Sequence, residues 1–339
     1  MSRPKKLTAV AALAAALAVM AGATASAPDE WLRPTTVPHP ENNAPTAERV
    51  ELGKMLFFDP RLSGSGAISC ATCHNPAMGW SDGQKTAIGH GSKVLGRGSP
   101  TILNTAYNPR QMWDGRKRTL EDQAIGPIEA VDEMNLPLDE MVKRLNGIEG
   151  YRLAFARAYP GEPIGKDTVA RAIASFERTV VSTEAPFDRW RAGNDKAVGE
   201  SVKRGFEVFK GKANCAACHQ GFNFTDNGFH NIGVRSLTPG DDEGRFAHVK
   251  IKALKGAFKT PTLRDIELTA PYMRNGLYGT LEEVVDHYDR GGDTKDNLSA
   301  NMKPLDLNAQ EKADLVAFMK SLTGKPMQIV VPTLPPNFN

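Results

Sequence analysis

Two copies of one pentapeptide, Cys-x-x-Cys-His, constrain this chain more than any other feature. They are Cys70-Ala71-Thr72-Cys73-His74 and Cys215-Ala216-Ala217-Cys218-His219, and together they use all four cysteines. The motif predicts covalent attachment of a c-type haem, with two thioether bonds to the cysteines and the histidine as proximal iron ligand. A zinc site or a disulfide is the alternative, but a histidine directly after each cysteine pair does not fit the usual zinc spacing. The sequence therefore predicts two haems.

Residues 1–27 are predicted to be a secretory signal peptide. Arg3, Lys5 and Lys6 precede an apolar run from Leu7 to Met20, and Ala25-Ser26-Ala27 supplies small residues for cleavage. The run is shorter than the roughly 20 residues of a membrane span, so we expect a periplasmic protein, with a retained anchor as the alternative.

The charge of the mature chain excludes some partners. Without the three basic residues of the signal, 39 of the 42 Lys and Arg remain against 39 Asp and Glu. A neutral chain of this kind favours neither nucleic acid nor an anionic membrane surface.

Length and periodicity predict a mostly α-helical protein of two domains. A mature chain of about 310 residues suits two domains, and two haem motifs require two. We expect an N-terminal domain over 28–190, a C-terminal domain over 191–325 and a proline-rich tail over 326–339 that lies across the surface. The polar segment 186–199 is predicted to link the domains. Helical apolar periodicity occurs after Thr46 and over 168–180, and no run alternates as a strand does.

An internal repeat supports this division. A Gly-x-x-x-Phe pattern precedes each haem motif, at Gly53 and at Gly205. Further segments recur at one offset: Ser99–Ile102 with Thr260–Leu263, Met112–Gly115 with Met273–Gly276, and Thr119–Asp122 with Thr280–Glu283.

Carried further, the same offset pairs Pro127 with Tyr288. Tyr288 lies on the apolar stripe of a predicted helix, and a phenol can ligate haem iron. Core filling, with the hydroxyl on a carbonyl, is the alternative, and Met273 and Met302 are the other candidate ligands. Proline has no side-chain donor, so the first haem is predicted to have an open iron and the second a capped one.

These residues together resemble the bacterial di-haem cytochrome c peroxidase family, including its MauG branch. The resemblance is carried by Leu52–Ser63, Trp113–Arg116, Thr260–Arg264 and Ala270–Tyr272. It implies two cytochrome c-like helical domains, each carrying one covalently bound c-type haem.

The resemblance also implies roles for residues around the first haem. Trp113 corresponds to an electron relay between the haems, and Gln123 and Glu133 correspond to polar residues above the peroxide-binding iron. A carboxylate there suits the movement of a proton from the inner to the outer peroxide oxygen. His90 corresponds to a loop histidine that closes this iron in some resting enzymes, with an ordinary exposed histidine as the alternative.

Three positions depart from the pattern of the electron-accepting peroxidases. Tyr288 stands where they carry methionine and MauG carries tyrosine, and Arg274 replaces a histidine. The family's calcium ion between the domains takes carbonyl ligands that correspond to Thr269 and Pro271, but its side-chain ligand corresponds to Gly98 here.

The leading hypothesis is a peroxidase that reduces hydrogen peroxide to water with electrons from a small redox protein, either a cytochrome c or a cupredoxin. His90 favours it. The alternative, favoured by Tyr288, is a MauG-like enzyme whose peroxide-derived high-valent iron oxidises a tryptophan or tyrosine of a partner protein. A non-catalytic di-haem electron carrier is a third hypothesis. Family members often form dimers, so a homodimer is also predicted.

Overall fold

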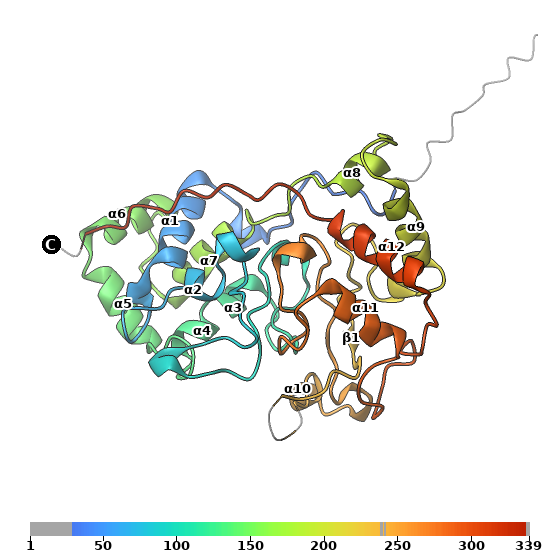
Figure 1. Ribbon diagram of the computed structural model, residues 1–339. Coiled ribbons are helices and arrows are strands. Elements are labelled where there is room, and N and C mark those ends of the chain that lie inside the picture. The colour runs from blue at the N-terminus through green and yellow to red at the C-terminus, as the bar shows by residue number, and fades with distance from the viewer. Residues whose placement is uncertain (1–28, 238–239, 241, 337–339) are drawn as a thin grey trace, which may run out of the picture.

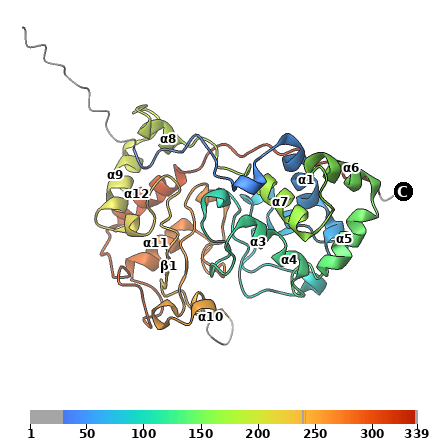
Figure 2. The ribbon, with the colours of Figure 1, turned by 180° about the vertical axis from the view of Figure 1, so that it is seen from behind.

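The computed structural model describes residues 29–237, 240 and 242–336, so the predicted signal peptide and the last three residues of the predicted tail lie outside it. The helices of the N-terminal half and those of the C-terminal half form two bodies side by side (Figure 1), and the view from behind shows the same division (Figure 2). No helix in the described part of the chain is long and apolar enough to cross a membrane.

The elements are helical apart from one short strand pair. The N-terminal half contains α1 (Ala47–Phe58), α2 (Cys70–Cys73), α3 (Leu120–Ala124), α4 (Gly126–Glu129), α5 (Leu138–Asn146), α6 (Glu149–Ala158) and α7 (Lys166–Glu177). The C-terminal half contains α8 (Pro186–Arg191), α9 (Glu200–Lys210), α10 (Phe246–Val249), α11 (Leu281–Asp289) and α12 (Ala309–Lys320). The strands β1 (Phe229–His230) and β2 (Phe258–Lys259) pair antiparallel.

The first core is built on the crossing of α1 and α7. Thr46 caps α1 by accepting a hydrogen bond from the backbone N–H of Arg49, as serine and threonine do at helix starts. A Cβ atom on Gly53 would lie 1.8 Å from the carbonyl oxygen of Ala172, so only glycine allows the two backbones to approach this closely. The rings of Phe57 and Phe176 then meet with their centroids 5.1 Å apart.

The second core repeats this crossing with α9 and α12. A Cβ atom on Gly205 would lie 1.9 Å from the carbonyl oxygen of Asp314, and the rings of Phe209 and Phe318 have centroids 4.8 Å apart. The Gly-x-x-x-Phe pattern before each haem motif is therefore the signature of one helix crossing used twice.

The repeat extends to the segment after each haem motif, with one difference. Met112 and Met273 both have φ 72°. Thr119 and Thr280 cap α3 and α11 by accepting hydrogen bonds from backbone N–H groups of the first turn. The first copy, however, breaks at Ile125 before Pro127, whereas α11 continues to Asp289. A proline ring cannot continue a helix, which explains the break.

The first part of the segment 186–199 is not a polar link, so the prediction was wrong for that part. It begins with α8, and Phe187 is fully buried against Phe206 and Phe318, with ring centroids 5.2 and 5.6 Å away. Trp31, from the start of the described chain, belongs to the same core. The predicted boundary at 190/191 stays a prediction.

The C-terminal tail returns to the N-terminal half. Figure 1 shows it running from α12 across the molecule toward α6. The side chains of Met327 and Ile329 pack against the first core. Arg61 Nη1 donates a hydrogen bond to the carbonyl of Pro335 at 2.9 Å. The tail therefore ties the two halves together.

Candidate functional site

A cavity of about 1080 Å³ lies beside the first haem motif. It is at the upper end of the roughly 300–1,000 Å³ typical of ligand pockets, which suits a large planar group. Its wall from the N-terminal half includes Cys70, Cys73 and His74, and its wall from the C-terminal half includes Leu237 and His248. Both halves are therefore needed to form it.

Each motif histidine is held with one ring nitrogen free. Nδ1 of His74 lies 3.3 Å from the carbonyl oxygen of Trp80, and Nδ1 of His219 lies 2.8 Å from that of Phe224. A carbonyl can only accept, so Nδ1 donates and the lone pair of Nε2 remains for a metal. Burial lowers the pKa of both histidines, which favours the neutral form that ligates iron.

The four cysteines are free and half-buried. Burial raises the pKa of Cys73 to about 11 and that of Cys215 to about 12, and it also raises the pKa of Cys70. Thiols in such surroundings are poor thiolates and poor ligands for a cation. Uncharged thioether bonds to a haem fit these positions better than a zinc site does.

Gln123 and Glu133 lie in the wall of the same cavity, together with Pro127. Burial raises the pKa of Glu133, and Asp132 adds to the rise, whereas Arg116 opposes it. A carboxyl group whose pKa is shifted toward neutrality can both accept and donate a proton. The polar groups predicted for the first haem thus share one cavity.

Trp113 lies between the two halves. Its indole lines the cavity, and its Nε1 donates to the carbonyl of Gly98 at 2.9 Å. Its own carbonyl accepts a hydrogen bond of 2.8 Å from the backbone N–H of Lys259 in β2. The residue thus joins the cavity wall directly to the C-terminal half.

Tyr288 lies beside the second haem motif. Burial raises its pKa, and the nearby Cys215 and Cys218 sulfurs raise it further. Its hydroxyl has no hydrogen-bond partner among the described residues. The alternative, in which Tyr288 only fills the core and its hydroxyl donates to a carbonyl, therefore has no carbonyl acceptor. His287 is fully buried and bonds elsewhere, with Nε2 2.8 Å from the carbonyl of Ile232.

His90 and the predicted calcium residues are not gathered in the first cavity. The backbone N–H of His90 bonds to the carbonyl of Glu133 at 2.8 Å, but its side chain is not in the cavity wall, and its buried Nδ1 has no partner among the described residues. Thr269 follows a short helical turn and packs near Gly79 of the other half. Calcium binding at Thr269 and Pro271 stays a prediction.

Comparison with known proteins decides the family. A family model for di-haem cytochrome c peroxidase matches residues 47–196, and one for cytochrome c matches residues 202–323. The methylamine utilization protein MauG of Methylorubrum extorquens is 51% identical over 306 residues, which cover 89% of this chain and 86% of that protein. The chain belongs to the di-haem cytochrome c peroxidase family.

Two further members of this family span nearly the whole chain. Cytochrome c551 peroxidase of Nitrosomonas europaea is 37% identical over 324 residues, covering 95% of this chain and 92% of that protein. A solved MauG-like protein associated with microbial copper homeostasis superposes with a TM-score of 0.80 at 33% identity, covering 87% and 95% of the two chains. The predicted fold and the predicted enzyme class, a peroxidase-type oxidoreductase, are confirmed. Membership of this enzyme family contradicts the hypothesis of a non-catalytic electron carrier.

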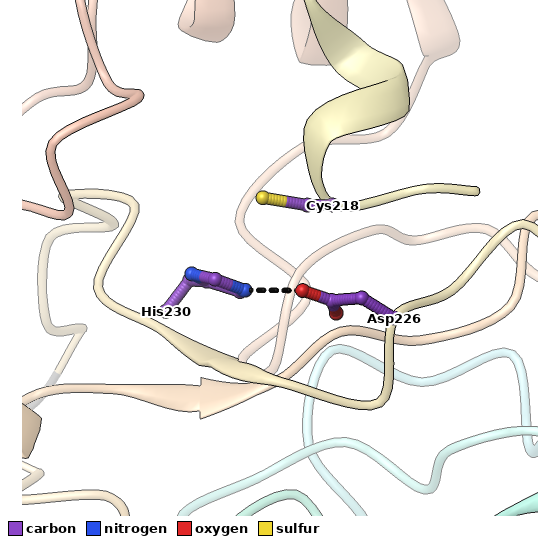
Figure 3. Close-up of side chains that lie close together, drawn as sticks. All are labelled: Cys218, Asp226 and His230. Carbon is purple, nitrogen blue, oxygen red and sulfur yellow. Dashed lines mark hydrogen bonds and ion pairs between the residues drawn. The ribbon is translucent and has the colours of Figure 1, made fainter.

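One side-chain cluster beside the second motif resembles a metal site. The ligand atoms of Cys218, Asp226 and His230 lie within 4.8 Å of one another (Figure 3), and no other such cluster of three occurs among the described residues. Nε2 of His230 lies 2.8 Å from Oδ2 of Asp226. In a di-haem peroxidase the Cys218 sulfur is expected in a thioether bond and the two other groups bind each other, so the cluster is better explained as support for the second haem.

Sequence reasoning did not place several residues at the first cavity. Arg97, Arg116 and Arg274 bring three guanidinium groups to its wall, which suits the two carboxylates of a haem. Arg97 also binds Asp114 at 2.6 Å and, across the two halves, Asp242 at 2.8 Å. Glu177 reaches the cavity from the end of α7. Arg116 and Arg274 lie in segments that the family resemblance and the internal repeat mark, but only the packing of the two halves brings these residues together.

Proposed function

We propose that the chain is a periplasmic di-haem enzyme that uses hydrogen peroxide to oxidise a tryptophan or tyrosine of a partner protein. The observation that carries this proposal is the place of Tyr288 beside the attachment cysteines of the second haem. The identity of 51% to a MauG protein supports the same choice.

The residues of the first cavity would bind and cleave peroxide. Cys70 and Cys73 would hold the haem covalently, and His74 would be its proximal ligand. The bound haem supplies an iron that binds peroxide and takes up oxidising equivalents. Gln123 would orient the bound oxidant by hydrogen bonding, and the Glu133 carboxylate would accept the proton of the inner oxygen and donate it to the outer one, so that water leaves.

The second haem would share the oxidising equivalents. Cys215, Cys218 and His219 would hold it, and electrons would pass to the first haem by way of Trp113. An anionic phenolate from Tyr288 would stabilise an oxidised iron more than a methionine thioether does. Both oxidising equivalents of one peroxide molecule would then remain in the enzyme until a partner side chain gives up electrons.

The second candidate is a peroxidase that takes electrons from a cytochrome c or a cupredoxin. It is favoured by His90, whose Nδ1 is buried without a partner and whose backbone is held by the segment that carries Glu133. A movement of this loop, whose Gly89 lines the cavity, would bring an imidazole toward it. The 37% identity to a cytochrome c551 peroxidase supports this candidate as well.

The two candidates differ in what the fully oxidised enzyme does with peroxide. One equivalent of peroxide is added to the oxidised enzyme without reductant, and the oxidising equivalents that remain are titrated after a delay. We expect two equivalents in the wild type. We expect Tyr288→Met to retain no oxidising equivalents unless the protein is first reduced by one electron. Tyr107→Phe, which removes a hydroxyl elsewhere, should behave as the wild type.

Turnover with reduced cytochrome c completes the test. Rapid peroxide-dependent oxidation of the cytochrome, together with no stored equivalents in the oxidised enzyme, would contradict the proposal and establish the second candidate. Electron paramagnetic resonance of the ferric protein and of Tyr288→Phe reports the axial ligands of both haems. An unchanged low-spin signal in the variant would remove Tyr288 as a ligand.

A further inference from the structure

Glu177 is a carboxyl group of the first cavity to which no part of the proposed function assigns a task. It ends α7, its side chain is in the cavity wall, and the residue is only 4% exposed. Its Oε2 atom is buried and has no hydrogen-bond partner among the described residues. Buried polar atoms are seldom left without a partner, so an orphaned oxygen at a haem cavity points to the group that fills the cavity.

The nearest cation does not neutralise Glu177. Arg178, its neighbour in sequence, turns to Glu121 on α3 and binds both carboxylate oxygens at 2.7 and 3.1 Å. Glu121 is held in that pair by Asn43 as well, through a hydrogen bond of 3.0 Å. The Arg178 charge is therefore shared with another carboxylate, and Glu121 adds a negative charge on the side of α3.

The surroundings of Glu177 consequently favour its protonated form. Burial raises its pKa to about 8; Arg178 opposes the rise, and Glu121 adds to it. Cys70 of the first motif interacts electrostatically with Glu177, because the Glu177 carboxylate raises the pKa of the Cys70 thiol. Once Cys70 is a thioether it would carry no charge, and a haem held there would bring its own charge to the cavity that Glu177 lines. The other charged side chains of the wall are Arg97, Asp114, Arg116, Asp132, Glu133, Asp242 and Arg274, and His248 is a further titratable group there.

We propose that Glu177 is the redox-linked proton site of the first haem. When this haem takes one electron from a reductant and changes from ferric to ferrous, the Glu177 carboxylate takes one proton from water; reoxidation returns the electron to an acceptor and the proton to water. The O–H bond of the carboxyl group is the only bond that forms or breaks. This inference rests on the proposed first haem but not on the reaction assigned to it.

The sign of the coupling follows from electrostatics. A ferric haem carries one more positive charge than a ferrous haem and therefore stabilises the carboxylate, so the pKa of Glu177 is lower in the oxidised protein. Coupling between two sites is reciprocal, so protonation of Glu177 makes reduction easier. The midpoint potential of the first haem accordingly falls as pH rises through the range between the two pKa values.

The test is a spectroelectrochemical titration of the full-length, haem-loaded protein, read at the high-spin haem over the pH range around 8. In the wild type we expect the potential to fall with pH by up to about 59 mV per unit, the one-electron equivalent of a tenfold change in proton activity. Glu177→Gln should abolish the slope, and Glu177→Asp should keep it. Glu129→Gln, which removes an exposed carboxylate of the same half, should behave as the wild type.

Redox-difference infrared spectra give an independent reading. The carbonyl stretch of a protonated carboxylic acid should appear on reduction and be absent from Glu177→Gln, while the haem spectra show that the variant is folded. A flat wild-type titration, or an unchanged slope in Glu177→Gln, overturns the proposal. Loss of the slope in Glu133→Gln alone would assign the proton to Glu133 and overturn it too. None of these readings depends on the substrate, so they can fail while the proposed function stands.

Discussion

Glu133 carries the most specific prediction at the scale of single residues. General acid–base catalysis contributes about 10²- to 10⁴-fold, so Glu133→Gln should slow the reaction with peroxide by that factor and leave the haem spectra unchanged. The carboxylate must be free to accept the proton, so the wild-type rate should rise with pH through a pKa above the usual glutamate range. Stopped-flow measurement over pH checks both points, with Glu129→Gln as control. A Glu133→Gln variant that reacts at the wild-type rate contradicts this role.

The residues that carry bonds to haem were predictable because their chemistry is local in sequence. A Cys-x-x-Cys-His run places its ligands within one helical turn, whatever the remainder of the fold does. Glu177 offered no such signal, since a glutamate at the end of an amphipathic helix is usually solvated. Its burial follows from the packing of α7 against α1 and α3, which no local pattern encodes. His230 and Asp226 were missed for the same reason.

At the scale of helices, the α1–α7 and α9–α12 crossings make a paired prediction. Gly53→Ala and Gly205→Ala would each place a methyl group less than 2 Å from a backbone oxygen. Overpacking costs about 1–3 kcal/mol, while alanine regains about 1 kcal/mol of helix propensity. The clash is with backbone, which cannot rotate away, so we expect a cost at the upper end of that range and a net loss of about 2 kcal/mol in the free energy of unfolding.

Urea denaturation of the haem-loaded protein measures this loss. Gly199→Ala is the matched control, because Gly199 lies at the start of α9 and a Cβ atom there meets nothing within 4 Å. It should change the free energy of unfolding by less than about 1 kcal/mol. Equal effects of Gly199→Ala and Gly205→Ala would show that the helix crossing tolerates a side chain.

Elements were predictable where periodicity and a cap agree, as after Thr46, which caps α1. The prediction failed at α8, where Pro186, Asp188 and two arginines made the segment look solvated. Phe187 is buried in the second core and Trp190 packs against it, but two apolar residues in a helix of six are too few to show a period. Long-range packing, not local propensity, forms this element.

For the whole molecule, the sequence predicted two similar halves but not how one completes the site of the other. The cavity beside His74 is closed by Asp242 and His248 of the C-terminal half. Two residues of the N-terminal half hold that closing segment. Arg97 binds Asp242 at 2.8 Å, and Asp114 pairs with His248 at 3.2 Å. Such contacts arise only when the halves meet, so a repeat that describes each half separately cannot contain them.

The tail that joins the halves makes the last prediction. Ile329 packs on the first core from the C-terminal end of the chain, whereas Val330 beside it is 80% exposed. Full burial of such a side chain contributes about 1.5–3 kcal/mol, and Ile329 is half-buried, so Ile329→Ala should destabilise the N-terminal half by about 1 kcal/mol. Val330→Ala should have no measurable effect. Truncation after Gly324 removes the whole contact, and in calorimetry it should lower the unfolding temperature of the N-terminal half, because the remaining contacts between the halves, such as Arg97–Asp242, are then all that joins them. A single transition with an unchanged midpoint in the truncated protein would mean that the cavity contacts alone couple the halves.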